Sequence, residues 1–469
     1  MKRHLTLVVG LALCSPPAAS IAFAQAPDQS QIDQLRQRID LMQQQMLDEL
    51  ARLRQELAKT EAQAVARQLP APPPPSLPVG DAQAETFSRD RETVARVDNA
   101  VGVADRAFLS IPGTPARFKV DGYAKLDTIV DGKPAGNPDQ FIPSSMPVGL
   151  SDALQTASTN LHVRQTRLNL DFRSPTELGE FRTFAEIDFY GSGGPVDPRM
   201  RHFYGQVANV LIGQTWTTFT DVDAYPDTLD FAGPVGISLL RQAQLRYTHP
   251  LTSGQSLAFA IERPLTQAPI LGTTGAAYNP APDVVVRYRL DGSEGHVQAG
   301  ALARALGYRI GERNTTQLGA GFNVGAAWNL YRRDRLQAYV VSGSGIARYV
   351  DNLAGSNADL DLDDAGTDVT PLGAFGGYVG YTHHWSSQLR STATAGYTSI
   401  NNTAGQLATA FHDSHYFSAN VIWNPAGALN VGVEYLLGTH RIISGDDAHA
   451  SRLQFSAKYD FFRKSVLAP

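Results

Sequence analysis

From about residue 117 onward, apolar and polar residues alternate along the chain with a period of two. In the stretch 117–127, apolar residues hold the even positions, while Lys119, Asp121 and Lys125 lie at odd positions. The stretches 181–189, 317–330 and 452–461 repeat this alternation. It predicts β-strands with one apolar and one polar face. Several of these strands exceed the five or six residues usual in soluble sheets and suit tilted membrane strands of about 9–11 residues.

The alternation predicts sixteen strands. They begin near residues 117, 160, 180, 199, 209, 239, 255, 282, 294, 315, 335, 370, 387, 413, 429 and 449. Short connections near 175–179, 207–209, 250–254, 291–294, 332–334, 385–387 and 425–428 alternate with long ones near 131–159, 191–198, 218–238, 263–281, 307–314, 347–369, 401–412 and 441–448. Because short periplasmic turns and long outer loops are typical of outer-membrane barrels, we predict an all-β fold, a sixteen-stranded antiparallel transmembrane β-barrel over residues 117–462, with a periplasmic tail at 463–469.

Aromatic residues gather where the even-numbered strands end, at the predicted periplasmic rim. They are Phe172, Tyr247, Tyr288, Trp328, Trp385, Trp423 and Phe461. An aromatic girdle at the membrane interface is expected of such a barrel. The alternative is that these residues only cap strands, as they do in soluble β-proteins.

The region before the barrel has a different, helical pattern. Residues 29–68 lack Gly and Pro, and their apolar residues follow a heptad seam. The seam consists of Ile32, Leu35, Ile39, Met42, Met46, Leu50, Leu53 and Leu57. One narrow stripe needs a partner helix, so we predict a self-associating α-helical coiled coil over 25–69 and a Pro-rich spacer and linker over 70–116. A helix lying on a membrane is the alternative, but its polar face mixes charges and lacks Trp and Phe.

The first 24 residues predict a signal peptide. Lys2 and Arg3 precede an apolar stretch, and Ala22-Phe23-Ala24 forms a small-residue cleavage site. Cys14, the single cysteine, lies inside this segment. A lipoprotein site at Cys14 is the alternative, although the bulky Leu13 precedes it. Cleavage leaves a mature chain that has no disulfides or thiol chemistry.

Composition adds three constraints. Charged residues make up 18% of the chain, below the roughly 25% of soluble proteins, which fits strands with one lipid-facing side. The pI near 6.1 argues against a nucleic-acid partner, which favours basic domains. A mean hydropathy of −0.20 leaves a large soluble β-protein as the alternative class.

Strand parity directs a set of basic side chains into the lumen. The predicted pore-lining, anion-binding residues are Lys125, Arg167, Arg199, Arg201, Arg246, Arg287 and Arg289. Arginine is permanently charged and suits carboxylates, and rings of such residues favour anions. The alternative is that they pair with lumenal acids such as Glu186, Asp188 and Glu434.

The connection 218–238 is apolar enough to pack inside the barrel. We predict that it folds inward as a constriction loop whose acids face arginines on the wall, with an ordinary surface loop as the alternative. Its key residues are Asp221, Asp223, Tyr225, Pro226, Asp227 and Asp230. The acidic connection 351–368 only begins like an EF-hand, so we expect a solvated loop, no bound metal and no cofactor.

Seven motifs connect the chain with a known family. They are FLSIPGT (108–114), VDGYAKLD (120–127), QTRLNLDF (165–172), RMRHFYGQ (199–206), IGQTWTTF (212–219), DVDAYPDTLDFAGPVG (221–236) and RQAQLRYT (241–248). With the order coiled coil, spacer and barrel, they resemble the DcaP-like trimeric porins of Gram-negative outer membranes. The motifs contain Arg167, Arg199, Arg201 and Arg246. One departure is the chain's end, where RKSVLAP follows Phe461-Phe462 instead of a final aromatic residue.

The resemblance implies a homotrimeric outer-membrane porin that passes small anions such as dicarboxylates, with its coiled coil in the periplasm. Outer-membrane lipid and lipopolysaccharide would surround it, and the coiled coil would offer a contact to peptidoglycan. Two alternative functions are a structural tether of the envelope and a barrel hydrolase. Histidines such as His383 and His412 are available to a hydrolase, but no nucleophile or zinc motif accompanies them.

Overall fold

The computed structural model describes residues 108–461, apart from 270–274, 331–332 and 364–366. The predicted signal peptide (1–24), coiled coil (25–69) and tail (463–469) lie outside these residues, as does the spacer up to residue 107. No helix in the described part of the chain is long and apolar enough to span a bilayer.

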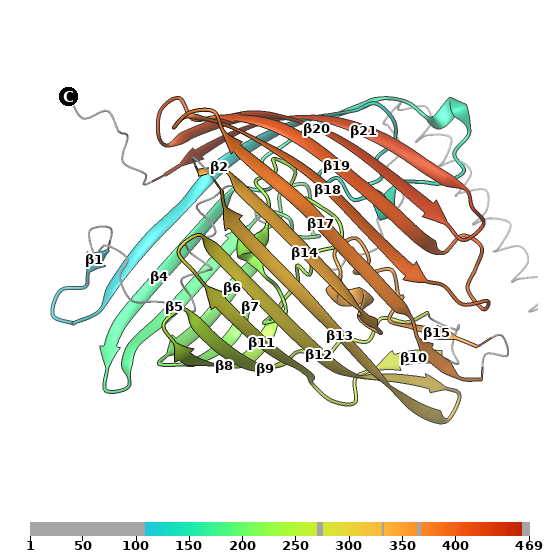
Figure 1. Ribbon diagram of the computed structural model, residues 1–469, viewed down its shortest axis with the longest axis horizontal. Coiled ribbons are helices and arrows are strands. Elements are labelled where there is room, and N and C mark those ends of the chain that lie inside the picture. Colours follow the sequence, from blue (N-terminus) through green and yellow to red (C-terminus); the bar gives the residue numbers. More distant parts are fainter. Residues whose placement is uncertain (1–107, 270–274, 331–332, 364–366, 462–469) are drawn as a thin grey trace, which may run out of the picture. The chain divides into compact units, whose positions relative to one another are not determined.

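Sixteen antiparallel strands follow one another around a closed sheet (Figure 1). They are β2 (Arg117–Asp131), β3 (Ser158–His162) together with β4 (Arg167–Thr176), β5 (Gly179–Asp188), β6 (Arg199–Val207), β7 (Val210–Trp216), β8 (Arg241–Thr252), β9 (Gln255–Glu262), β11 (Asp283–Asp291), β12 (Gly295–Ile310), β13 (Arg313–Asn329), β14 (Arg335–Ser344), β17 (Gly373–His384), β18 (Leu389–Asn401), β19 (Phe411–Trp423), β20 (Leu429–Ile442) and β21 (Asp447–Asp460). Every predicted strand start lies within three residues of an observed one, which confirms the predicted fold class.

Short elements accompany the barrel. Strand β1 (Leu109–Ser110) pairs with β2, β10 (Gly275–Tyr278) pairs with β12, and β15 (Leu360–Leu362) pairs with β16 (Val369–Pro371). Single 3₁₀ turns form η2 (Pro143–Ser145), η3 (Asp152–Leu154), η4 (Val222–Ala224) and η6 (Ala347–Tyr349). All four turns lie in connections between barrel strands.

The last strand closes the barrel against the first. Strand β21 pairs with β2 in antiparallel register, which sets Lys458 opposite Lys125 and Arg452 opposite Asp131. Closure pairs the backbone groups that an open edge would leave unsatisfied in lipid.

The two faces of the sheet have opposite characters. Apolar side chains such as Val324, Phe417 and Phe455 point outward and are 41–48% exposed, whereas Arg167 and Glu434 point inward and are fully buried. Apolar residues outside and charged residues inside reverse the arrangement of a soluble protein, as expected where lipid covers the outer face. The predicted girdle residues Tyr247, Tyr288, Trp328, Trp385 and Trp423 are all 38–64% exposed at the short-turn end.

Two of the predicted long connections are short turns. Strands β12 and β13 stay paired up to Ile310 and Arg313, and β20 and β21 up to Arg441 and Asp447. The predictions near 307–314 and 441–448 were wrong because polar residues there continue the hairpins beyond the apolar belt. The second barrel strand is interrupted, since residues 163–166 separate β3 from β4.

Candidate pore constriction

The connection between β7 and β8 lies inside the barrel. Apart from half-buried Val222, every residue from 217 to 240 is buried. Phe219, Leu229 and Ile237 are 0% exposed. We call residues 217–240 the constriction loop.

Glycines on the inner wall let the constriction loop lie directly against the strands. A Cβ atom on Gly376 of β17 would lie 2.6 Å from the Cα of Gly236 in the loop. A Cβ atom on Gly380 would lie 2.8 Å from the Cβ of Pro226. Such contacts are too close for any side chain larger than hydrogen. The glycines at inward-facing positions of β17 are the sequence signal for this packing site. The prediction of inward-facing residues considered only charged side chains and therefore missed them.

The tip of the constriction loop is bound to β20, β19 and β2. Oε2 of Glu434 accepts the backbone N–H groups of Leu229 and Asp230, both at 2.7 Å. Nδ2 of Asn420 donates to the other Glu434 oxygen at 3.1 Å, and Nζ of Lys125 donates to the carbonyl of Leu229 at 2.7 Å. Lys125 therefore serves as an anchor of the loop.

The carboxylates of the constriction loop contact the wall on which the loop lies. Asp221 lies 2.9 Å from Nε2 of His296, and Asp223 lies 2.8 Å from Arg289. Asp227 pairs with Arg390 at 2.5 Å. Asp223 and Asp227 thus each have an arginine partner on the wall, and Asp221 has an imidazole.

Asp230 and Tyr225 stabilise the tip from within. Asp230 accepts the N–H groups of Phe141 and Gly233, each at 2.9 Å. The Tyr225 hydroxyl donates to the carbonyl of Ala232 at 2.8 Å. Burial raises the pKa of Asp230 to about 6, although Arg452 partly offsets it. Neither residue is placed to bind a solute.

Two more connections between strands extend into the barrel and form hydrogen bonds with the constriction loop. The connection 132–157 supplies the Phe141 bond to Asp230, and its Ser144 N–H donates to Asn352 at 2.8 Å. The connection 345–372 binds in turn, because the N–H of Asp351 donates to the carbonyl of Ile237 at 2.7 Å. The three inward connections form one hydrogen-bonded body.

The expectation of a solvated acidic loop at 351–368 was wrong for its buried members. Asp351, Asp359 and Asp361 are at most 5% exposed. Arg304 compensates Asp359 at 2.9 Å and Asp283 at 3.2 Å. Burial raises the pKa of Asp351 well above its ordinary value. Because Arg304 is distant in sequence from Asp359, the sequence alone did not reveal this ion pair.

Three of the predicted arginines form one cluster on β4–β6. Arg201 lies 2.7 Å from Glu186 and 2.9 Å from Asp188. Arg199 also pairs with Asp188, at 2.5 Å, and Arg167 lies 3.8 Å from Glu186. The two carboxylates are therefore shared among three guanidinium groups.

Arginines outnumber carboxylates over the whole wall from β4 to β8. The residues are Arg167, Arg173, Arg182, Arg199, Arg201, Arg241 and Arg246 against Asp171, Glu180, Glu186 and Asp188. We call these strands the arginine wall. The four aspartates of the constriction loop have no basic residue within the loop itself, so the two surfaces differ in sign.

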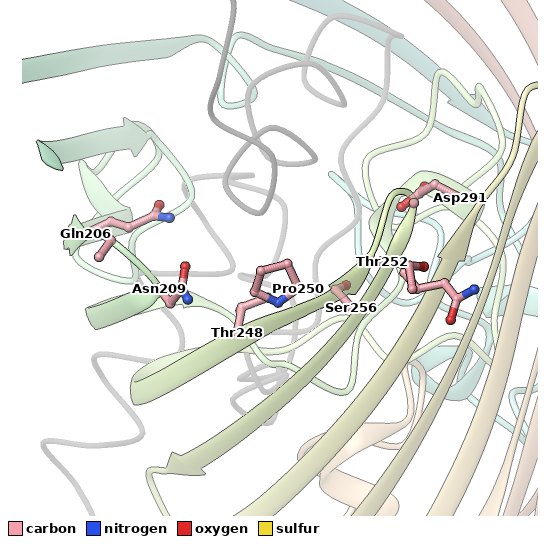
Figure 2. A pocket seen from close by; sticks show the side chains of 10 residues that line it. Gln206, Asn209, Thr248, Pro250, Thr252, Ser256 and Asp291 are labelled. Atoms are coloured by element: carbon pink, nitrogen blue, oxygen red, sulfur yellow. The ribbon is translucent and has the colours of Figure 1, made fainter.

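Arg287 and Arg289 lie apart from the arginine wall, on β11. Both point inward, and Arg289 also contacts Asp291 at 2.8 Å. Asp291 lines a polar pocket of about 120 Å³ where three short turns meet. Figure 2 shows Gln206 and Asp291 at opposite ends of this pocket, with Thr248 and Ser256 between them. Arg289 does not line this pocket itself but contacts one of its lining residues, Asp291.

The model of the DcaP outer membrane protein family matches residues 109–461. The chain belongs to this family. The match covers the whole described barrel and all but the first residue of the seven motifs.

A solved structure shares the fold of this DcaP-family chain. The outer membrane channel DcaP of Acinetobacter baumannii superposes with a TM-score of 0.68 at 23% identity, covering 76% of this chain and 100% of that one. OmpT of Vibrio cholerae has a TM-score of 0.47 at 13% identity, covering 76% and 100%. A search of curated proteins found no significant match. Family and fold are those of an outer-membrane porin, which places the chain in the outer membrane.

Proposed function

We propose that this porin is a passive diffusion channel for small anionic solutes of the dicarboxylate class. The observation that carries the proposal is the excess of seven arginines over four carboxylates on β4–β8. Fixed positive charge on a water-filled wall raises the local concentration of anions and their entry rate. The porin family and fold favour such a channel over the hydrolase alternative.

The shared ion pairs of the arginine wall suit exchange with a moving solute. Arg199 and Arg201 both bind Asp188, and Arg201 also binds Glu186. A solute carboxylate can take one guanidinium while the other keeps the protein carboxylate, so no charge is left unpaired. Charge-assisted bonds between arginine and carboxylate are strong and directional. Arg199, whose side chain is 15% exposed, is the member of the pair that can meet a solute carboxylate, while the fully buried Arg201 keeps Asp188.

We further propose that three copies assemble into a homotrimer within outer-membrane lipid and lipopolysaccharide. The heptad seam of residues 25–69 supports self-association on the periplasmic side, where that segment would also reach peptidoglycan. Light scattering of the full chain in detergent tests this proposal. A trimer mass is expected, and a monomer mass would contradict it.

Liposome swelling tests the solute class. Purified full-length protein should admit succinate faster than the diol or diamine of the same carbon number. Arg199→Gln with Arg201→Gln should bring the three rates together. The control is Arg309→Gln, on the outer face of β12 with its guanidinium bound to Asn314, which should leave the ratio unchanged. Equal rates for all three solutes in the unaltered protein would overturn the proposal.

A further inference from the structure

Charges balance where the constriction loop leaves β7. The carboxylates of Asp221, Asp223 and Asp291 all lie within 4 Å of the guanidinium of Arg289 on β11. Arg287 lies two residues before Arg289 on the same face of β11, and Arg335 of β14 donates to the backbone carbonyl of Asp223 at 2.9 Å. This part of the lumen is therefore close to neutral, whereas the arginine wall has an excess of positive charge.

Arg289 is the central member of this group. Its guanidinium lies 2.8 Å from Asp223, 2.8 Å from Asp291 and 3.7 Å from Asp221. The side chain is 14% exposed, whereas those of Asp221 and Asp223 are 0% and 9% exposed. Arg289 is thus more exposed than either loop carboxylate that it contacts.

We infer that Arg289 determines charge selectivity by neutralising the constriction loop, without binding the solute itself. The inference rests on the proposed anion preference and deepens it. Three carboxylates already occupy its donors, so an anion would have to displace a closer partner. The Asp221 side chain is fully buried, 2.9 Å from Nε2 of His296 and 3.7 Å from the guanidinium of Arg289, so its carboxylate depends on these partners.

Asp221, Asp223 and His296 form a cluster that would be left without its arginine if Arg289 were replaced. One ligand atom from each of Asp221, Asp223 and His296 lies within 4.8 Å of the others. Two carboxylates and an imidazole are suitable ligands for zinc. In the native chain the guanidinium holds this position as the resident cation. Without it, the carboxylates would face the lumen with a net negative charge and attract cations.

The test compares variants of the full-length protein in planar bilayers. Arg289→Gln should lower anion preference, and micromolar Zn²⁺ should reduce its conductance reversibly with a chelator. Adding Asp221→Asn and Asp223→Asn to this variant should restore the anion preference and remove the zinc effect. The matched control Arg246→Gln, on the arginine wall, should lower anion preference without zinc sensitivity.

Two outcomes would overturn the inference. If the two Asn substitutions fail to restore anion preference, Arg289 acts on the solute directly. If Arg289→Gln shows no zinc sensitivity, the loop carboxylates are not exposed by its loss. Retained heat-modifiable migration on gels verifies that each variant is a folded barrel. Failure of the proposed function is a separate result, because it appears as absent anion preference in the unaltered protein.

Discussion

Glu434 holds the tip of the constriction loop, and its replacement tests whether the loop sets the width of the pore. Oε2 accepts two backbone N–H groups at 2.7 Å, and Oε1 accepts Asn420 at 3.1 Å. A hydrogen bond to a charged group contributes roughly 1.5–3 kcal/mol, and a buried donor left unsatisfied costs a similar amount. Glu434→Ala should therefore weaken loop packing by about 3 kcal/mol or more. Since about 1.4 kcal/mol is a factor of ten, the ratio of packed to released loop should fall by roughly a hundredfold.

Single-channel recording is the assay for this release. Glu434→Ala should show added open-channel noise and excursions to larger conductance, because the loop leaves its place in the lumen. Glu434→Gln is the matched control, since its amide oxygen can still accept both N–H groups and only the Asn420 bond is lost. It should resemble the unaltered channel. Identical noise and conductance in the Ala variant, with the barrel folded, would refute the role of Glu434 as an anchor.

Two further predictions concern pH and stability. Because burial raises the pKa of Asp230 to about 6, the packed loop binds its proton more tightly than a released loop would. Packing is favoured below about pH 4 and weakens as pH rises through about 6, so channel noise should increase from pH 5 to pH 7.5, and less so in Asp230→Asn. Noise that increases on acidification would contradict this sign. Arg452→Met should destabilise the barrel by about 3–5 kcal/mol, because it removes the arginine that lies 2.7 Å from Asp131 and leaves this buried carboxylate without its ion-pair partner. The control Arg313→Met breaks an exposed pair with Asp368 and should change stability by about 0–1 kcal/mol; equal melting shifts in a heat-modifiability assay would disprove the distinction.

The strands could be predicted from the sequence because their signal is local. Alternation with a period of two identifies a strand wherever one face meets lipid and the other water. The predicted starts at 199, 255, 335 and 429 coincide with the first residues of β6, β9, β14 and β20. The two mistaken long loops arose because a hairpin can continue above the apolar belt, where outward-facing residues such as Arg309 and Asn314 are polar.

The interior could be predicted only in part, since it depends on contacts between distant residues. Parity directed Arg201 and Arg289 inward, but gave no indication that Arg289 would bind Asp223 while Arg201 would bind Glu186. Likewise, Asp359 looked solvated because its partner Arg304 lies on another strand. Counter-ions are set by which strands the closed sheet brings together, and the local pattern does not contain that information.

The central claim is that the arginine wall makes the lumen prefer anions. The most direct measurement is the reversal potential of the purified full-length protein in a planar bilayer under a tenfold KCl gradient. The account predicts a potential whose sign shows preferential passage of chloride, reduced when Arg199 and Arg201 are replaced by Gln. A potential near zero, or one with the sign of potassium preference, would contradict it.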